Sequence, residues 1–413
     1  MNSIKSQLIV GVISTFCIFV SVHTSAQGHH HASNPVNRSI DKKQDSCQSN
    51  FLECANAATP YFTANGQLYL VWSAQGNVLI AKSTDLGKSF DSPKKLAEHG
   101  KTLDTGSDAR PQILVDQQKI LVAYAFFKDT QWNAQVNLIR SEDGGESFST
   151  PLPLIQNDSS QRFPILGQSP QGEVWIIWVD KRLIQESKKR GNPMLGGSIA
   201  YAWSSDFGKT FIEEQIANKH TCECCRIGMA FNSEGLPFIV YRAILNGGIR
   251  DHVTQEIGKK RIGPVRRIAL DDWKTDACPH HGPAITVSDK NDIHVAWFTQ
   301  GSQRQGVFYA QSKDHEALYS QAKAIGSEGA IISRPYLLSN EQDIWIVWKE
   351  FNGKETRIMA QYSVTEGLEW STSQVISKTA GYSDHPLLIK GQGKVFLSWL
   401  TRLDGYQFIA LKK

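Results

Sequence analysis

Two short stretches concentrate the residue types that bind metals or form disulfides. The first is Cys222-Glu223-Cys224-Cys225-Arg226, with three thiols in four positions, and the second is Cys278-Pro279-His280-His281-Gly282-Pro283. Thiolates and imidazoles are the ligands that soft and borderline ions such as Cu(I) and Zn(II) select. The candidate metal ligands are therefore Cys222, Cys224, Cys225, Cys278, His280 and His281, with copper or zinc as the candidate ion.

Disulfides are the competing interpretation of these cysteines. Six cysteines remain once Cys17 of the N-terminal apolar run is set aside, and an even number in an exported chain is typical of a disulfide framework. Cys47 and Cys54 are close in sequence, so we expect a local bridge between them. The other four could form two bridges, or Cys224 and Cys225 a reducible vicinal one. C-x-C-C is not a standard zinc spacing, whereas disulfides do not require the two histidines beside Cys278, so both interpretations stay open.

The first 26 residues are expected to be an export signal. Lys5 precedes an apolar run from Leu8 to about Val22, and Thr24-Ser25-Ala26 offers the small residues of a cleavage site. The run is too short for a convincing membrane span, so we expect a periplasmic or secreted protein without stable membrane insertion. The 44 basic and 40 acidic residues form no basic arm, and this balance argues against nucleic acid as a partner.

Residues 27–56 are polar and irregular and are expected to form a loose lead-in to the folded part. Cleavage after Ala26 would leave Gln27-Gly28-His29 at the terminus, where an amine, two amides and an imidazole suit Cu(II) or Ni(II). This pattern, together with the predicted export, favours copper over zinc as the ion of the cysteine cluster.

From residue 57 onward the chain repeats, and the repeat predicts the fold. Each unit runs from a proline or glycine through an apolar strand to a tryptophan or tyrosine twelve to fourteen residues later; the pairs are Pro60 and Trp72, Pro111 and Tyr124, Pro164 and Trp178, Gly228 and Tyr241, Pro283 and Trp297, Pro335 and Trp348, and Pro386 and Trp399. Strands that are almost continuously apolar are typical of small sheets stacked on both faces. Residues 57–413 are therefore expected to form an all-β, single seven-bladed β-propeller. The last unit has room for only three strands, so Phe51–Cys54 is expected to supply the fourth and close the ring.

The turn after the third strand of several units carries a recurrent motif. It reads STDLGKSF from Ser83, SEDGGESF from Ser141 and SSDFGKTF from Ser204. These turns resemble the Asp-box, or BNR repeat, of the sialidase superfamily, which implies structural roles for Asp85, Asp143 and Asp206 at the end of the propeller away from the active face. The active members of that superfamily usually have six blades, so a six-bladed ring is the alternative architecture, and the cysteine clusters would make this chain a non-standard member.

Propeller connectivity places the residues that lead into the inner strands around one end of the central axis. The expected ligand-binding residues there are Arg110, Arg162, Arg226, Arg334 and His385. Such a concentration of positive charge suggests an anionic or polar ligand. The alternative is that each arginine only ties adjacent blades together through backbone carbonyls.

Three functions follow as hypotheses. The first is an exported propeller, expected to be a monomer, that binds a small molecule, a glycan or a metal ion on its axial face through the loops of blades four and five. The second is implied by the sialidase resemblance: a glycoside hydrolase with an arginine clamp, an acid/base and a tyrosine nucleophile. No motif places that nucleophile, and Tyr241 and Tyr382 are simply available tyrosines. The third is a protein-binding propeller with structural disulfides.

Overall fold

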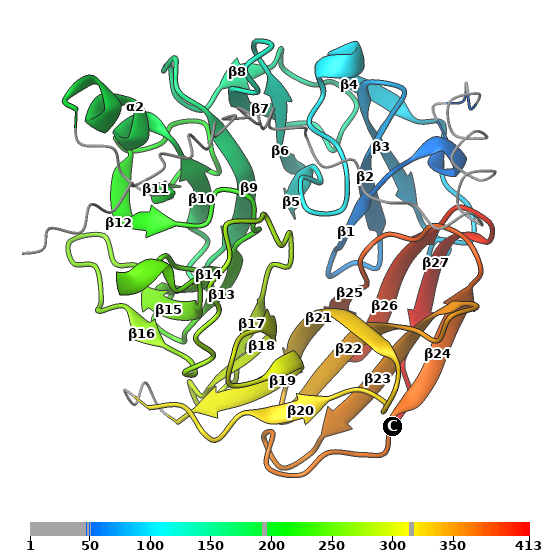
Figure 1. Cartoon of the computed structure of the whole chain (residues 1–413). Coiled ribbons are helices and arrows are strands. Elements are labelled where there is room, and N and C mark those ends of the chain that lie inside the picture. The colour runs from blue at the N-terminus through cyan, green and yellow to red at the C-terminus, as the bar shows by residue number, and fades with distance from the viewer. Residues whose placement is uncertain (1–46, 48, 50, 192–195, 314–317) are drawn as a thin grey trace, which may run out of the picture.

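The computed structural model describes residues 47, 49, 51–191, 196–313 and 318–413. Within these residues seven antiparallel sheets surround a common axis (Figure 1), so the predicted seven-bladed β-propeller is confirmed and the six-bladed alternative is wrong. The predicted export signal and the Gln27-Gly28-His29 pattern lie outside the described residues. No helix in the described part of the chain is long and apolar enough to cross a membrane.

The first four blades follow one another along the chain. Blade one contains β1 (Ala58–Phe62), β2 (Leu68–Ala74), β3 (Asn77–Ser83) and β4 (Lys94–Glu98), and blade two contains β5 (Gln112–Asp116), β6 (Lys119–Phe127), β7 (Ala134–Ser141) and β8 (Leu152–Pro153). Blade three contains β9 (Gln161–Gln168), β10 (Val174–Asp180), β11 (Gly197–Ser204) and β12 (Gln215–Thr221), and blade four contains β13 (Gly228–Phe231), β14 (Pro237–Arg242), β15 (His252–Glu256) and β16 (Arg266–Arg267).

The last three blades complete the ring. Blade five contains β17 (Ala284–Val287), β18 (Ile293–Gln300), β19 (Gln305–Ser312) and β20 (Lys323–Ile325), and blade six contains β21 (Ile331–Asn340), β22 (Asp343–Phe351), β23 (Thr356–Ser363) and β24 (Gln374–Thr379). Blade seven contains β25 (Leu387–Gly391), β26 (Lys394–Thr401) and β27 (Gly405–Ala410). The first strand of each blade contacts the first strands of both neighbours, and β25 contacts β1, so these strands line the axis.

The second strand of each blade supplies the core between blades. All residues of β2 and β10 are buried, and the large side chains that are almost fully buried include Trp72, Trp178 and Trp297. Each such side chain stabilises the fold by about 1.5–3 kcal/mol because it leaves water completely. The apolar runs of the sequence are therefore sheets covered on both faces.

Ring closure differs from the prediction. Leu52–Cys54 forms a short 3₁₀ helix, η1, that contacts β2 and β27 and pairs with neither, so the expected fourth strand from Phe51–Cys54 is wrong. Backbone groups that a fourth strand would need form hydrogen bonds within this turn: the Cys54 amide donates to the Phe51 carbonyl oxygen at 3.1 Å. A disulfide joins Cys47 to Cys54, as predicted, and η1 lies in contact with blades one and seven.

The three Asp-box-like aspartates lie in the turns between third and fourth strands, at the end of the ring opposite the loops that enter the inner strands. In each turn the aspartate accepts a hydrogen bond from the backbone amide four residues later, at 2.8–2.9 Å. Hydrogen bonds from Ser89 and Ser83 lower the pKa of Asp85 to about 2. Gly87, with φ of +77°, takes a conformation that a side chain would strain.

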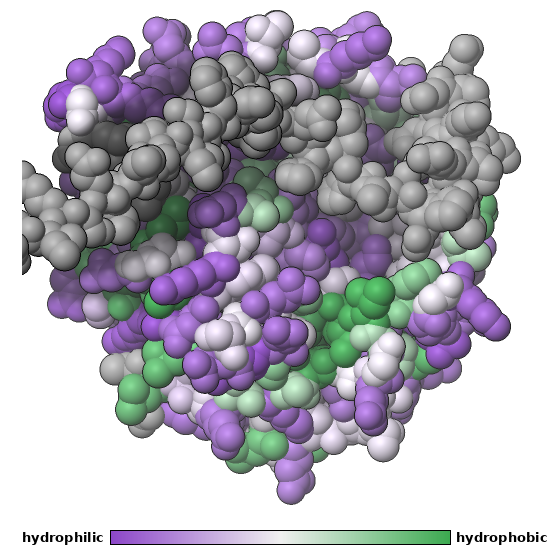
Figure 2. Space-filling model, viewed as in Figure 1, coloured by the Kyte–Doolittle hydropathy of each residue, from purple (hydrophilic) through white to green (hydrophobic). Residues whose placement is uncertain are grey.

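Two further features concern the surface. The helix α2 (Arg182–Lys189) belongs to the excursion after β10 and packs against β11 at the periphery of blade three, away from the axis (Figure 1). Figure 2 shows the molecule from the side seen in Figure 1. The described surface on this side is mostly hydrophilic, with hydrophobic side chains gathered beside β21 and β25.

Candidate functional site: an axial pocket beside a cysteine and histidine cluster

A pocket of about 120 Å³ lies where the entries to the inner strands meet. All seven blades contribute to it: the lining includes Thr59 of blade one, Asp108 and Arg110 of blade two, Phe163 of blade three, Arg226 of blade four, Pro283 of blade five, Tyr336 of blade six and His385 of blade seven. Contributions from every blade place the pocket on the axis, at the end of the ring where the sequence predicted a ligand site.

Irregular backbone shapes this pocket in blades three and six. The pairing of β9 with β10 and of β21 with β22 shifts register around Phe163 and Arg334, each of which precedes a proline. Both residues have positive φ, 53° for Phe163 and 56° for Arg334. A bulge of this kind aims a side chain away from the regular strand direction, and such bulges are common beside functional sites.

Asp108 is the charge around which the pocket is organised. Its carboxylate accepts a hydrogen bond from Nη1 of Arg226 at 3.2 Å and from Nη1 of Arg334 at 3.3 Å. Nδ1 of His385 lies 3.8 Å from the same carboxylate and 3.4 Å from Nη1 of Arg226. Two guanidinium groups therefore share one carboxylate, so the described residues at this point of the axis carry more positive than negative charge.

Burial and these cations determine the protonation of the neighbouring bases. Burial, reinforced by Arg334 and Arg226, holds the pKa of His385 well below its usual value, so the imidazole is neutral near pH 7. Burial also lowers the pKa of Lys349 to about 8, with Arg334 adding to the effect, and raises the pKa of Tyr336. The pocket thus offers cationic and neutral hydrogen-bond donors to a ligand.

The predicted ligand-binding arginines divide into two groups. Arg226 and Arg334 meet at Asp108, whereas Arg110 and Arg162 are held by the scaffold. Arg110 donates to the Asp384 carboxylate at 2.6 Å and to the Ala58 carbonyl oxygen at 3.0 Å, which ties blades one, two and seven together. Arg162 forms a two-point ion pair with Asp104, with distances of 2.7 and 2.9 Å. For Arg110 the geometry matches the blade-tying alternative.

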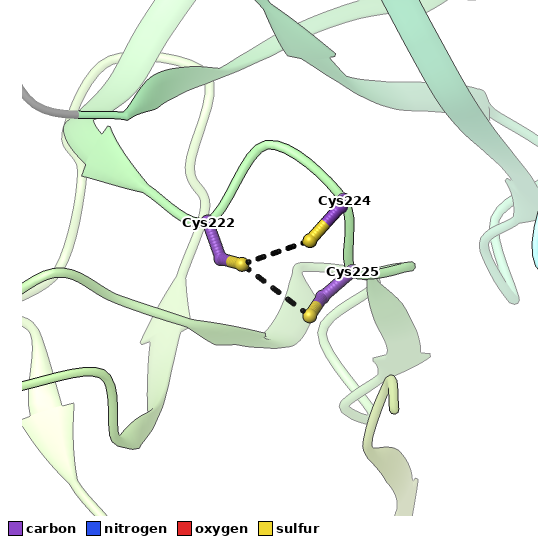
Figure 3. A group of neighbouring side chains, drawn as sticks. All are labelled: Cys222, Cys224 and Cys225. Atoms are coloured by element: carbon purple, nitrogen blue, oxygen red, sulfur yellow. Dashed lines mark hydrogen bonds between the residues drawn. The ribbon is translucent and has the colours of Figure 1, made fainter. Parts of the chain in front are cut away.

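The cysteines of the first stretch form a compact group on the loop that enters blade four (Figure 3). The Sγ atom of Cys222 lies 3.4 Å from that of Cys224 and 3.5 Å from that of Cys225, and all three side chains are buried. These distances are hydrogen-bonding distances between thiols, well beyond the roughly 2.05 Å of a covalent S–S bond. The three cysteines are free in this structure.

The second stretch extends this group from the loop that enters blade five. Cys278 and His280 lie with Cys224 in a set whose ligand atoms are all within 4.8 Å of one another, and Cys222, Cys224 and Cys225 form a second such set. Cys224 belongs to both sets. The structure thus brings together five of the six predicted metal ligands; we call these five residues the Cys/His cluster.

His281 and His385 lie apart from the Cys/His cluster. The ring of His281 stacks on Phe298 with centroids 4.0 Å apart, and its carbonyl oxygen accepts a hydrogen bond from Arg242. Burial is the main reason why the pKa of His281 falls to about 2. His280 thus reaches the sulfurs, whereas the ring of His281 packs against Phe298 of blade five.

The pKa values of the thiols in the Cys/His cluster are shifted in different directions. Hydrogen bonds from Cys224 and Cys225 hold the pKa of Cys222 well below its usual value, and the pKa of Cys224 is raised because its thiol is the donor. A hydrogen bond from Cys224 lowers the pKa of Cys278 to about 7. Nη1 of Arg250 lies 3.9 Å from Sγ of Cys222 and also favours a thiolate there. The pKa of Cys225 is raised as well, so thiolate character is concentrated at Cys222 and Cys278.

The tyrosines differ from the sequence-based expectation. Tyr241 is buried in the core, where its hydroxyl donates to the Gln255 side chain at 3.0 Å, so it is not available to a ligand. Tyr382 is exposed and does not line the pocket, and the Arg402 guanidinium lies 5.1 Å from its ring centroid. Tyr336, which sequence reasoning missed, lines the pocket, and so does Asp108. Tyr336 directly follows the landmark Pro335, and Asp108 precedes the predicted ligand Arg110 by two residues. This closeness to predicted positions could have identified both residues from the sequence.

Known proteins resemble this chain in structure, and none matches it in the sequence comparisons. No family model and no curated protein sequence matches the chain. Among solved structures, an ulvan lyase of polysaccharide lyase family PL25 bound to -[GlcA(1-4)Rha3S]- aligns with a TM-score of 0.54 at 10% identity, covering 84% of this chain and 90% of that chain. The polysaccharide lyase Uly1 aligns with a TM-score of 0.54 at 10% identity, covering 86% and 88% of the two chains. The NanB sialidase from Streptococcus pneumoniae gives a TM-score of 0.48 at 11% identity, over 80% of this chain and 69% of that chain. At 10% identity, the likeness to the two lyases concerns the fold alone, which in this chain is a seven-bladed β-propeller.

Proposed function

We propose that this chain is an exported metal-binding β-propeller, in which the Cys/His cluster holds one soft or borderline ion at the edge of the axial pocket. The observation that carries the proposal is the pair of overlapping ligand sets that share Cys224, with all ligand atoms of each set within 4.8 Å. Four sulfurs at such short range repel one another once ionised, and a bound cation removes that repulsion. Cu(I) is favoured because thiolate-rich sites select it, with Zn(II) as the second choice.

Free thiols distinguish this proposal from the disulfide hypothesis. Cys47 and Cys54 are bonded, whereas Cys222, Cys224, Cys225 and Cys278 are free. Titration of thiols in protein purified from its native compartment, with elemental analysis of the same sample, tests the difference. We expect about one copper or zinc per chain and four thiols that react only after the metal is removed. A protein with no metal and no titratable thiols would overturn the proposal in favour of two further disulfides.

A matched pair of variants tests the ligand assignment. His280→Asn should lower the affinity for Cu(I), measured by competition with a chromogenic chelator, because it removes a ligand atom of the Cys/His cluster. Changes to outer-shell partners alone commonly cost about 10–100-fold in metal affinity, and loss of a ligand should cost at least as much. His281→Asn should leave the affinity unchanged, since its ring stacks on Phe298 outside both sets. Equal affinities for both variants and the wild-type protein would remove His280 from the site.

A second candidate function is the binding of an anionic saccharide in the axial pocket. Arg226, Arg334 and Tyr336 present donors around an excess positive charge, and the fold is shared with a lyase that was solved with a glucuronate-containing ligand. Saturation-transfer NMR with a glucuronate oligosaccharide, compared with its neutral glucose counterpart, tests this function. We expect only the carboxylated probe to bind and Tyr336→Phe to weaken it. Binding of neither probe, or of both equally, would count against it.

Hydrolysis and export are tested separately. A fluorogenic sialoside assay addresses the glycoside hydrolase form of the second candidate, and inactivity across several glycosides would leave binding alone. N-terminal sequencing of the mature protein addresses export: Gln27 is the expected first residue, and an intact Met1 would contradict it.

A further inference from the structure

We infer that Arg334 and Arg226 are positioning residues for the metal ion of the Cys/His cluster, so that the axial pocket and the metal site form one coupled unit. This inference rests on the proposed function, because it concerns the regulation of that metal site. Neither arginine supplies a metal ligand. Each acts through a residue that does.

The first connection runs through Arg334. Its Nη1 donates to the carbonyl oxygen of His280, whose imidazole belongs to the Cys/His cluster, and also to the Asp108 carboxylate at 3.3 and 3.4 Å. His280 has a positive φ of 51°, as Arg334 has one of 56°. A residue other than glycine holds such a backbone conformation only when its surroundings enforce it. The guanidinium of Arg334 is therefore part of what keeps the His280 ring directed at the sulfurs.

The second connection runs through the chain itself. Cys225 is buried in the cluster and is followed directly by Arg226, whose side chain donates to Asp108 at 3.2 Å. A planar peptide unit joins the two residues, so a displacement of Cys225 moves the backbone of Arg226 with it. Asp108 thus receives one arginine from the loop of blade four and another that clamps the loop of blade five.

A third contact locks these two loops against each other. Gly282 lies so close to Arg226 that an added Cβ would meet the Arg226 side chain and come within 2.9 Å of its carbonyl oxygen. Gly282 follows His280 by two residues. A shift of either loop that accompanies metal binding must therefore be shared by the other loop and by both guanidinium groups.

The consequence is reciprocal. If the metal ion prefers the present arrangement of Arg226 and Arg334 around Asp108, then changes to that arrangement alter metal affinity by the same factor by which the metal alters the pocket. Couplings of this kind typically change affinity about 5- to 150-fold. An anion that draws either guanidinium away from Asp108 would act on the metal site through these contacts, and metal loading would act on the pocket.

The test measures Cu(I) affinity in the full-length protein by competition with a chromogenic chelator. Arg334→Gln removes the clamp on His280, and we expect affinity to fall at least fivefold while the thiolate signal is kept. X-ray absorption of the Cu(I) complex should show loss of the nitrogen ligand, a change that general destabilisation would not produce selectively. Arg334→Lys, which keeps the charge and one donor, should restore part of the affinity. Arg182→Gln is the matched control, because the side chains of Arg182 and Arg334 are both 18% exposed and Arg182 pairs with Asp180 and Glu214 in blade three.

The outcomes separate this inference from the proposed function. If the wild-type protein binds no metal, the proposed function fails and the inference falls with it. If the wild-type protein binds metal and Arg334→Gln matches it within twofold, with the nitrogen ligand retained, only the inference is overturned. Should Arg334→Gln fail to fold, Asp108→Asn replaces it: loss of the shared carboxylate should also lower Cu(I) affinity at least fivefold, and an unchanged affinity would overturn the inference.

Discussion

Asp384 is predicted to form the ion pair that contributes most to closing the ring. Removing its charge should lower the free energy of unfolding more than most single substitutions do. Its carboxylate is 2% exposed and accepts hydrogen bonds from Nη2 of Arg110 at 2.6 Å, from the Ala58 amide at 3.1 Å and from the His385 amide at 2.6 Å. These contacts join blades one, two and seven at the point where the chain closes on itself.

The substitution Asp384→Asn keeps the side-chain shape and removes the charge. Arg110, whose side chain is 8% exposed, would then be a buried cation without a counter-charge, and the new amide group would turn donors toward the donors that remain. Breaking a buried ion pair by removing one partner costs about 3–5 kcal/mol. We expect a loss of that size in the free energy of unfolding, measured by equilibrium urea titration with tryptophan fluorescence.

Two controls make this prediction refutable. Asp129→Asn changes a carboxylate on an exposed turn, where water solvates the groups left behind, and should cost no more than about 1 kcal/mol. The double variant Asp384→Asn with Arg110→Gln removes both charges and should be less destabilised than the sum of the single variants by about 1–3 kcal/mol. A single variant within about 1 kcal/mol of wild type, or strictly additive effects, would refute the fastening role of Asp384.

Three further predictions concern the disulfide, a buried acid and the interlocked loops. Replacing Cys47 and Cys54 with serine should lower the free energy of unfolding by roughly 2–3 kcal/mol, as expected for so short a closed loop, and an unchanged urea midpoint would show that the segment contributes nothing. Burial raises the pKa of Asp271 to about 6 from 3.8, so the folded state binds more protons between those values and the free energy of unfolding falls as pH rises from about 4 to about 6. Asp271→Asn should remove up to about 3 kcal/mol of that fall, and identical pH profiles for variant and wild type would contradict the assignment. Gly282→Ala should cost about 1–3 kcal/mol because its Cβ meets Arg226, and it should also weaken Cu(I) binding; full stability with unchanged binding would argue against the interlock.

The ring of blades could be predicted because the sequence pattern that produces one blade repeats along the chain. Each second strand carries a large aromatic residue that must be buried between blades, and Trp72, Trp178 and Trp348 are all buried as that pattern requires. Seven repetitions of one local rule leave little choice of architecture. Ring closure occurs only once in the chain, so no repeated pattern predicts it. The backbone of Leu52–Cys54 forms its hydrogen bonds within a turn and not with a neighbouring strand.

The site could be predicted only to the level of a loop. The repeat places Cys278, His280 and His281 on one entry loop, but it does not say which imidazole turns toward the sulfurs, and that choice depends on the positive φ of His280. Likewise, the positions before the inner strands identified Arg226 and Arg334 but not the carboxylate they share. Asp108 looks like any polar loop residue until blades two, four and six are brought together in space.

The four arginines of the axial face show how one residue type serves both scaffold and site in this ring. Arg110 and Arg162 each have a carboxylate of their own, Asp384 and Asp104, so their charge is neutralised and they hold neighbouring segments in register. Among the residues that the structure describes, Arg226 and Arg334 share Asp108, so one positive charge at the axis has no carboxylate of its own. Because buried charges are costly unless they are paired, this arrangement supports the proposed anionic ligand, which would supply negative charge there. The two arginines that lack full neutralisation are also the two that reach the Cys/His cluster, through Cys225 and His280. An anionic ligand and a metal ion at this end of the propeller would therefore act on the same pair of side chains.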